Sequence, residues 1–438
     1  MLLRQFVDHD LGCASYLVAD EATHQALIVD PAYAIEPYLA QAGRDGLRLI
    51  GVLETHTHAD HVSGHGRLAL EHGLVVHVHP EANADYPFVP LEDGGVIPVG
   101  DDHVRVLHTP GHRPEHCCFV AGDAVLTGDS LFVGTAARPD LAVDAHDGAE
   151  GLFHSLRRLM DLPDDFVVYP GHVAGSLCGT GISADPSSTI GTERRGNPAL
   201  SFSLVDDFIE SSATVPAARP PNMARIVELN RGPFLAGREP LHPVSADGAT
   251  VLDVRPARVF AAGHVPGAFN VPVSGSSFGT RAGFLVEPDE RVVIHASSPE
   301  EAALAAQRLR AVGLLDLEGY LDAPRADETM KTISVADLDG LLRDGTEVID
   351  VREHEERSEG FVAGTRHVPY RLIRASATSV PHDRPVITLC ESGARAAIAA
   401  SVLLAQGVDA RPVLDGGVAD LEADGKNLVE FRRCGGGH

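Results

Sequence analysis

The chain has 438 residues, 44% of them hydrophobic, so it can bury several separate cores. Its 62 acidic and 35 basic residues give a formal net charge of −27, which argues against nucleic acid or an anionic membrane as a partner because both need a basic face. The 6 cysteines are too few and too scattered for a disulfide framework, and no apolar run resembles a signal peptide or a membrane span. These features predict a cytoplasmic protein of roughly two to four domains.

The first predicted domain, residues 1–238, alternates short apolar runs with loops rich in glycine and aspartate. Four of these runs read as strands, and each leads into a candidate ligand. Loops at the same edge of packed sheets can bring such ligands together while the strands hold them rigid. The runs are 47–53, 104–107, 124–126 and 166–168, and the ligands that follow them are His56, His112, Asp129 and His172.

The first of these loops, residues 56–61, has the sequence His-Thr-His-Ala-Asp-His. Three imidazoles and a carboxylate within six residues cannot all be packing residues of a hydrophobic core, because each would need its own hydrogen-bond partner when buried. Neutral imidazole nitrogens and an anionic oxygen are ligands that suit Zn, Fe or Mn. The segment therefore predicts a metal site at the end of a strand.

A proline-rich passage near residues 216–243 reads as a linker, and an internal repeat follows it. Each copy alternates strand, loop and helix, which predicts two small α/β domains with parallel sheets, residues 239–326 and 327–438. The matching segments are 251–255 with 348–352, 263–267 with 360–364, 292–296 with 386–390, and 317–319 with 414–416.

Four separated motifs of the first domain resemble those of the metallo-β-lactamase superfamily: Thr-His-x-His-x-Asp-His, Thr-Pro-Gly-His, Gly-Asp-Ser and Tyr-Pro-Gly-His. The resemblance implies an αββα sandwich but does not name the reaction. Hydrolases of the glyoxalase II type fill two metal positions, the first corresponding to His56, His58, His112 and Asp129, the second to Asp60, His61, Asp129 and His172. The similar persulfide dioxygenases hold a single Fe(II), whose ligands correspond to His56, His112 and Asp129.

Three further segments favour the iron-containing branch. Arg138-Pro139-Asp140 resembles an Arg-x-Asp segment of persulfide dioxygenases, in which Arg138 could orient Asp140, neutralise developing sulfite or form a surface ion pair. Cys178 lies in a segment similar to a cysteine-bearing loop of one multidomain subgroup, as a sulfur-binding or an inert residue. The likeness continues over residues 188–198, where Arg194 and Arg195 are candidate anchors for an anionic thiol carrier. In this branch His58, Asp60, His61 and His172 would support the ligands or a water molecule.

In the second copy of the repeat, residues 390–395 read Cys-Glu-Ser-Gly-Ala-Arg between a strand and a helix. Loop amides and a helix N-terminus stabilise a thiolate, and Arg395 can receive an anion. The segment resembles the active loop of rhodanese sulfurtransferases, with Cys390 and Arg395 as catalytic residues; a phosphatase or an arsenate reductase is the alternative. In the first copy Ala296 and Glu301 stand at these two positions, so that domain is predicted to be degenerate.

The whole chain resembles multidomain persulfide dioxygenase–sulfurtransferases of sulfide detoxification. The resemblance implies that Fe(II) and molecular oxygen oxidise a thiol persulfide to sulfite, and that Cys390 converts sulfite to thiosulfate. Glutathione, coenzyme A, bacillithiol and mycothiol all remain open as the thiol, and a homo-oligomer is the expected assembly. The alternatives are a di-zinc thioester hydrolase fused to a sulfurtransferase, and a sulfur carrier or signalling protein with an incidental metal site.

Overall fold

The computed structural model describes residues 1–139, 142–173, 181–212, 219–246, 248–321, 325–423, 425 and 428–429. The chain forms two compact units, the first made of Met1–Glu239 with Leu309–Gly313, the second of Pro240–Arg308 with Leu314–His438. The predicted boundaries at residues 238 and 326 stay a prediction. Within the described residues, no helix is both long enough and apolar enough to cross a membrane.

The first sheet of the first unit has six strands in the order β1-β2-β3-β4-β5-β6. Strands β1 to β3 pair antiparallel, and β3 to β6 pair parallel. Helices α1 (Glu36–Asp45) and α2 (His65–His72) connect the parallel strands, as βαβ crossovers require. The strands are β1 Leu2–Asp8, β2 Cys13–Ala19, β3 Gln25–Val29, β4 Arg48–Leu53, β5 Val75–Val78 and β6 Val89–Pro90.

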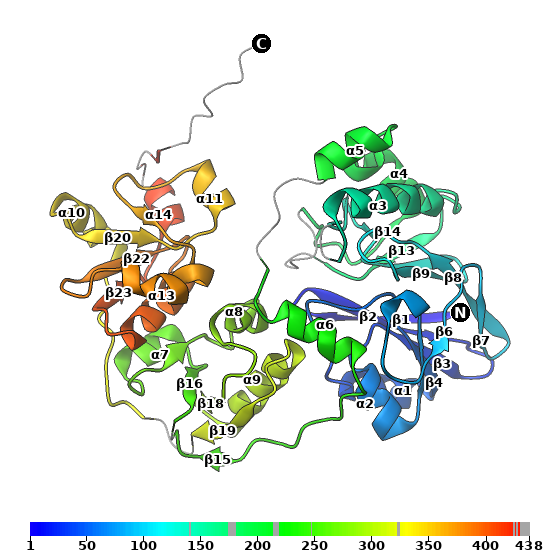
Figure 1. The fold of residues 1–438 in the computed structure, drawn as a ribbon, viewed down its shortest axis with the longest axis horizontal. Coiled ribbons are helices and arrows are strands. Elements are labelled where there is room, and N and C mark those ends of the chain that lie inside the picture. Colours follow the sequence, from blue (N-terminus) through cyan, green and yellow to red (C-terminus); the bar gives the residue numbers. More distant parts are fainter. Residues whose placement is uncertain are drawn as a thin grey trace, which may run out of the picture. The chain divides into compact units, whose positions relative to one another are not determined.

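The second sheet also has six strands, in the order β14-β13-β10-β9-β8-β7. Figure 1 shows helices α3 (Ala145–Leu159), α4 (Ile190–Gly196) and α5 (Val205–Ser212) on its outer side. Helix α6 (Met223–Arg231) follows them in the chain, and β11 (Leu131–Phe132) pairs with β12 (Thr135–Ala136) in a short hairpin. The strands are β7 Val96–Val99, β8 Asp102–His108, β9 Cys117–Ala121, β10 Ala124–Gly128, β13 Val167–Pro170 and β14 Ser188–Thr189.

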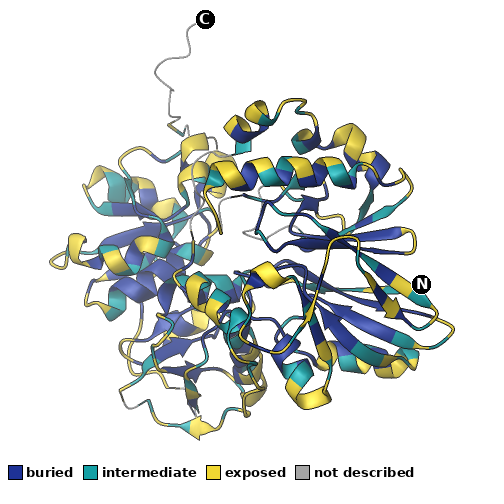
Figure 2. Cartoon of the chain, turned by 45° about the vertical axis from the view of Figure 1, so that its right-hand side comes forward, coloured by how far each residue is buried: buried dark blue, intermediate teal, exposed yellow. Residues whose placement is uncertain are grey.

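The two sheets pack face to face because alternate residues of each strand point into a shared core. Tyr16 and Leu27 from the first sheet meet Phe119 and Leu126 from the second in this core. The outer face of each sheet is covered by helices, so most strand residues are buried while the helices expose one side (Figure 2). The result is the four-layer αββα sandwich that the sequence motifs predicted.

The second unit contains two parallel sheets, in the orders β15-β19-β18-β16-β17 and β21-β20-β22-β23. The first carries α7 Ala257–Ala262, α8 Phe278–Leu285 and α9 Pro299–Ala311; the second carries α10 Leu338–Arg343, α11 His354–Glu359, α12 Ile373–Ser376, α13 Ala394–Ala405 and α14 Val418–Ala423. The strands are β15 Pro243–Val244, β16 Thr250–Asp253, β17 Phe269–Asn270, β18 Val292–His295, β19 Leu317–Leu321, β20 Glu347–Asp350, β21 Arg366–His367, β22 Val386–Leu389 and β23 Ala410–Pro412.

The repeat in the sequence is also a repeat in the structure. Strand β16 pairs parallel with β18, and β20 pairs in the same way with β22. At the end of each first strand a buried aspartate binds an arginine two residues later, at 2.6 Å for Asp253–Arg255 and 3.0 Å for Asp350–Arg352. Each arginine also donates to a glycine carbonyl eight residues further on. The predicted α/β class is therefore confirmed for both halves of the chain.

Candidate functional site

The predicted ligands of the first unit lie just after the carboxyl ends of β4, β8, β10 and β13. Two glycines make this convergence sterically feasible. A Cβ at Gly171 would lie 2.5 Å from Asp129 Oδ1, and one at Gly111 would lie 2.5 Å from the backbone of Leu152 in α3. Gly111 also has a φ of 151°, which L side chains rarely adopt, so glycine is required to bring the His112 loop against α3.

The structure brings three of the predicted ligands together, His56, His112 and Asp129. All three are buried, and their donor atoms lie within 4.8 Å of one another. Asp129 Oδ2 is 3.9 Å from His56 Nε2 and 3.5 Å from His112 Nε2. His56 Nε2 and Asp129 Oδ1 have no hydrogen-bond partner among the described residues. Because buried polar atoms without partners are costly, and two imidazoles with one carboxylate suit Fe or Zn, these residues fit a metal ion.

Hydrogen bonds fix the tautomers of both imidazoles. The Thr55 hydroxyl donates to Asp30 Oδ2 at 2.8 Å, so it accepts from His56 Nδ1 at 2.9 Å. His112 Nδ1 donates to the carbonyl of Arg138 at 2.9 Å. Each histidine therefore directs an Nε2 lone pair at the centre. Burial also lowers the pKa of His56 and of His112, which keeps both rings neutral as ligands must be.

His58 adjoins this group of three, and its ring centroid lies 4.3 Å from that of His56. Its Nε2 lies 3.3 Å from Asp30 Oδ1 and 3.3 Å from Glu54 Oε2, and these three residues form a buried cluster of their own. The carboxylates raise the pKa of His58 although burial alone would lower it. Its other ring nitrogen, Nδ1, is buried and has no hydrogen-bond partner among the described residues, so His58 stays a candidate fourth ligand for the first position of the hydrolases.

Asp60, His61 and His172 form a chain of contacts that begins at Asp129. His172 Nε2 is 3.2 Å from Asp129 Oδ2 and 3.5 Å from Asp60 Oδ2. Asp60 is 3.3 Å from His61 Nδ1 and accepts from Cys13 Sγ at 3.1 Å. Cys13, Asp60 and His61 thus form a second group of donor atoms close enough to hold an ion.

Sequence reasoning missed Asp30, Cys13 and His116 as parts of this region. His116 Nε2 accepts from the backbone N–H of Asp129 at 3.0 Å, and burial lowers the pKa of His116 to about 3. His116 Nδ1 contacts the hydroxyl of Thr109 at 2.9 Å. The motifs contain a weak signal for such support, since Thr55 and Thr109 precede the ligand loops. Asp30 follows β3 without any motif.

The predicted substrate-binding residues have different surroundings. Asp140 and Cys178 lie outside the described residues. Arg138 contributes its carbonyl to His112. Arg194 pairs with Asp164 and donates to the carbonyls of Met160 and Leu162, so it anchors the last turn of α4 to the end of α3. Arg195 is exposed in the same turn.

Cys390 lies in the second unit, between β22 and α13, and is buried. The backbone N–H of Gly393 donates to Cys390 Sγ at 3.1 Å. Gly393 has a φ of 90°, which lets the loop curl around the sulfur. The guanidinium of Arg395 is held by both oxygens of Glu356, at 2.5 and 2.6 Å. In this loop a backbone amide therefore donates to the cysteine sulfur, and the arginine forms an ion pair with a carboxylate.

In the corresponding loop of the first repeat, the backbone amide binds a carboxylate and not a cysteine sulfur. Ala296 follows β18 where Cys390 follows β22, and the N–H of Ser297 donates to Glu301 Oε2 at 2.5 Å. A carboxylate from the chain itself thus binds a loop amide next to the position that carries sulfur in the second repeat. At the two positions occupied by Cys390 and Arg395 in the second repeat, this loop has Ala296 and Glu301, which supply neither a thiol nor a cation.

Comparisons with known proteins agree with this description. The family model of the metallo-β-lactamase superfamily matches residues 10–172, and that of the rhodanese-like domain matches residues 240–323 and 334–424. A crystal structure of a metallo-β-lactamase from Staphylococcus aureus superimposes with a TM-score of 0.68 at 30% identity, covering 74% of this chain and 99% of that one.

Two kinds of relative share the first half of the chain. The human mitochondrial persulfide dioxygenase ETHE1 is 30% identical over 237 residues, which is 52% of this chain and 87% of the relative. The hydroxyacylglutathione hydrolase of Rhodopseudomonas palustris is 37% identical over 162 residues, which is 36% of this chain and 61% of the relative. The chain therefore belongs to the metallo-β-lactamase superfamily. More particularly, it is a fusion of that fold with rhodanese-like domains, and its relatives include persulfide dioxygenases.

Proposed function

We propose that the first unit is an iron-dependent persulfide dioxygenase and that Cys390 of the second unit transfers sulfur to the sulfite it forms, giving thiosulfate. The observation that carries the proposal is the ligand set: the donor atoms of His56, His112 and Asp129 lie within 4.8 Å of one another. Two histidines and one carboxylate are the facial triad of non-haem iron oxygenases. The similarity to persulfide dioxygenases over 87% of the human enzyme supports the same assignment.

At this centre the protein supplies orientation and charge. Bound Fe(II) would supply open coordination positions at which oxygen and a persulfide sulfur can react. Thr55 and the Arg138 carbonyl fix the two imidazoles, and the Asp129 carboxylate supplies negative charge. Burial alone would raise the pKa of Asp129, but His172 and His112 lower it to about 2, so Asp129 is ionised at neutral pH.

In the second unit Cys390 would act in two displacements. Its thiolate attacks the outer sulfur of a persulfide, forming a Cys390–sulfur bond and breaking the bond to the carrier, which leaves as a thiolate. The sulfur lone pair of sulfite then attacks that outer sulfur, forming thiosulfate and releasing the Cys390 thiolate. The Gly393 N–H would stabilise the sulfur, and Arg395 would attract the incoming anion in competition with Glu356, which holds its guanidinium.

A di-zinc thioester hydrolase fused to a sulfurtransferase is the second candidate. The second group of donors around Asp60 and His61, and the relatives that are hydroxyacylglutathione hydrolases, favour it. It requires a second metal per chain and consumes no oxygen. A cytoplasmic location and a homo-oligomeric assembly stay predictions.

Oxygen uptake tests the choice. Iron-loaded protein given glutathione persulfide should consume oxygen and form sulfite, whereas zinc-loaded protein should not. Asp129→Ala should abolish uptake while leaving sulfur transfer from thiosulfate to cyanide unchanged. If no thiol persulfide supports uptake and the protein binds two zinc ions and cleaves thioesters, the hydrolase is correct.

A further inference from the structure

The loop that carries the first metal motif, residues 54–64, is almost entirely buried although it contains no helix or strand. We call it the histidine loop. Buried backbone N–H and C=O groups outside regular secondary structure need partners from other segments. Several such groups of this loop bind residues far along the chain: the carbonyls of His58 and His61 and the amides of Val62 and Ser63. The conformation of the histidine loop therefore depends on the two segments that provide these partners.

The first partner is Asn230, a buried residue of α6. Its Nδ2 donates to the carbonyl of His58 at 2.9 Å and to the carbonyl of His61 at 2.8 Å. Its Oδ1 accepts from the backbone N–H of Ser63 at 2.8 Å. One amide group thus binds the backbone on both sides of Asp60, and these bonds need a donor and an acceptor on the same side chain.

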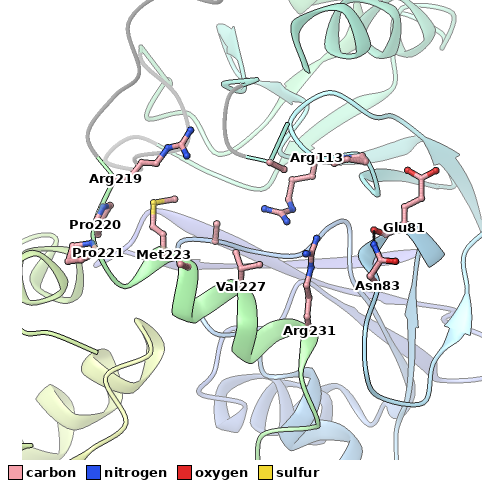
Figure 3. A pocket seen from close by; sticks show the side chains of 13 residues that line it. Glu81, Asn83, Arg113, Arg219, Pro220, Pro221, Met223, Val227 and Arg231 are labelled. Atoms are coloured by element: carbon pink, nitrogen blue, oxygen red, sulfur yellow. Dashed lines mark hydrogen bonds between the residues drawn. The ribbon is translucent and has the colours of Figure 1, made fainter. Parts of the chain in front are cut away.

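Helix α6 presents two different sets of side chains at four-residue spacing. Figure 3 shows Met223, Val227 and Arg231 pointing from the helix toward a cavity of about 740 Å³. Ile226 and Asn230 have the same spacing, are only 1% and 4% exposed, and do not line this cavity. The helix therefore directs Asn230 into the protein, where the histidine loop lies.

The second partner comes from the first repeat. Residues 309–313, which contain the end of α9, belong to the first compact unit and not to the second. The carbonyl of Ala311 accepts from the N–H of Val62 at 2.7 Å. A Cβ at Gly313 would lie 3.2 Å from Cγ1 of Ile226 and 3.9 Å from Cγ2 of Val62. The end of α9 therefore packs against both α6 and the histidine loop.

Asn222 joins the end of α9 to α6. It is the N-cap residue of α6, a position at which an asparagine side chain usually accepts from an amide of its own helix, but no such bond is found among the described residues. Instead, its buried side chain donates from Nδ2 to the carbonyl of Val312 at 2.6 Å. This side chain thus binds the segment from the first repeat and does not cap its own helix.

We propose that Asn222, Asn230 and residues 309–313 form a clamp that holds the histidine loop in its metal-binding conformation, so that the first repeat, which lacks the cysteine, serves the metal centre through the end of α9. Both asparagines are positioning residues, because they bind backbone carbonyls and no donor atom of a candidate ligand. The role of the clamp goes beyond the proposed function, since a dioxygenase and a hydrolase would both bind metal at this loop.

Asn222→Asp tests the clamp without altering any residue that contacts the histidine loop directly. Aspartate is as good an N-cap residue as asparagine, so α6 is not weakened, but an ionised carboxylate cannot donate to the carbonyl of Val312. In the whole metal-free chain, the Val62 amide should exchange with deuterium about tenfold faster, measured by mass spectrometry.

Co(II) provides the second measurement on the same variant, because its visible spectrum depends on the arrangement of its ligands. Retention of Co(II) by the whole chain during competition with a chelator should fall by about tenfold in Asn222→Asp, the size typical of a lost supporting hydrogen bond. The spectrum of the bound ion should also change. A role in general stability alone would not change the spectrum of the folded, loaded protein.

Asn230→Asp should have the same effects, because a carboxylate can still accept from Ser63 but cannot donate to the two carbonyls of the histidine loop. The matched control is Asn270→Asp. Asn270 is a buried asparagine of the first repeat that also donates to two carbonyls, those of Asp253 and Arg255, but it lies in the second unit. This control should keep wild-type Co(II) retention and wild-type exchange of the histidine loop.

Wild-type exchange and Co(II) retention in Asn222→Asp would overturn the clamp, and this variant decides the matter even if Asn230→Asp does not fold. Equal losses in Asn270→Asp would also overturn it, because they would reflect general destabilisation. If both clamp variants behave as expected but iron-loaded wild-type protein consumes no oxygen with any thiol persulfide, the clamp stands and the proposed function is wrong.

Discussion

A single hydroxyl sets the orientation of one ligand at the candidate metal centre. Thr55 accepts from His56 Nδ1 only because its own proton is donated to Asp30. Asp30 in turn contacts Nε2 of His58, so one buried carboxylate orients two neighbouring histidines. Such supporting hydrogen bonds typically change metal affinity by about 10–100-fold.

Thr55→Val should therefore weaken iron binding by about tenfold or more, because His56 loses the acceptor that fixes its tautomer. The measurement is iron retention during competition with a chelator, followed by elemental analysis. Thr55→Ser is the control, since serine keeps the hydroxyl that accepts from His56 Nδ1. Equal iron retention in both variants would contradict the role of Thr55.

Glu356 has a comparable influence on the sulfur-transfer loop. It holds Arg395 through two short hydrogen bonds, and it also accepts from the N–H of Glu353 as part of a capping box in α11. Burial alone would raise the pKa of Glu356, but Arg395 lowers it, so the carboxylate stays ionised and competes with any anionic substrate.

Glu356→Gln should lower the KM for sulfite by roughly fivefold, because a neutral amide binds Arg395 more weakly while its oxygen can still cap the helix. Initial rates of thiosulfate formation at varied sulfite concentration give this value. Glu355→Gln, an exposed position of the same helix, should leave the KM unchanged. A raised KM in Glu356→Gln would show that the carboxylate instead positions Arg395 productively.

At the scale of elements, the candidate metal ligands that directly follow strands could be predicted from the sequence, because apolar runs and histidine motifs are local signals. His56, His112 and Asp129 were placed in this way. The contact of His58 with Asp30 could not be predicted, since Asp30 follows β3 and comes close only through the pairing of β3 with β4. The occupied loop of the first repeat was predicted to be inactive from Ala296 and Glu301, but the contact of Glu301 with the Ser297 amide required the structure.

Gly111 shows how one helix and one loop depend on each other. Gly111→Ala would place a Cβ against the backbone of α3 at a φ of 151°, so we expect a loss of about 1–3 kcal/mol in the free energy of unfolding and a loss of bound metal. Urea unfolding and metal analysis measure both. Gly196→Ala at the end of α4, where a Cβ meets nothing within 4 Å, should be neutral or slightly stabilising.

At the scale of the whole molecule, the chain combines a metal centre that is proposed to form sulfite with a cysteine, Cys390, that is proposed to convert this sulfite to thiosulfate. Covalent linkage raises the effective concentration of one site at the other without any new contact. The first repeat has Ala296 and Glu301 in place of the cysteine and arginine of the second, and that it serves as a spacer or docking surface stays a prediction. Because its strand and helix segments repeat, the pair of α/β domains could be predicted from the sequence.

Cys390→Ser should shift the product of persulfide oxidation from thiosulfate to sulfite without changing oxygen uptake, because the metal centre lies in the other unit. Mixing this variant with Asp129→Ala restores both activities on separate chains, so thiosulfate should return, but its share should fall on dilution. Wild-type protein should keep a constant share if linkage matters. Ion chromatography of sulfite and thiosulfate over a hundredfold dilution provides the readout. Unchanged thiosulfate from Cys390→Ser alone would remove Cys390 from the reaction, and equal dilution curves would show that fusion of the domains does not couple the two steps.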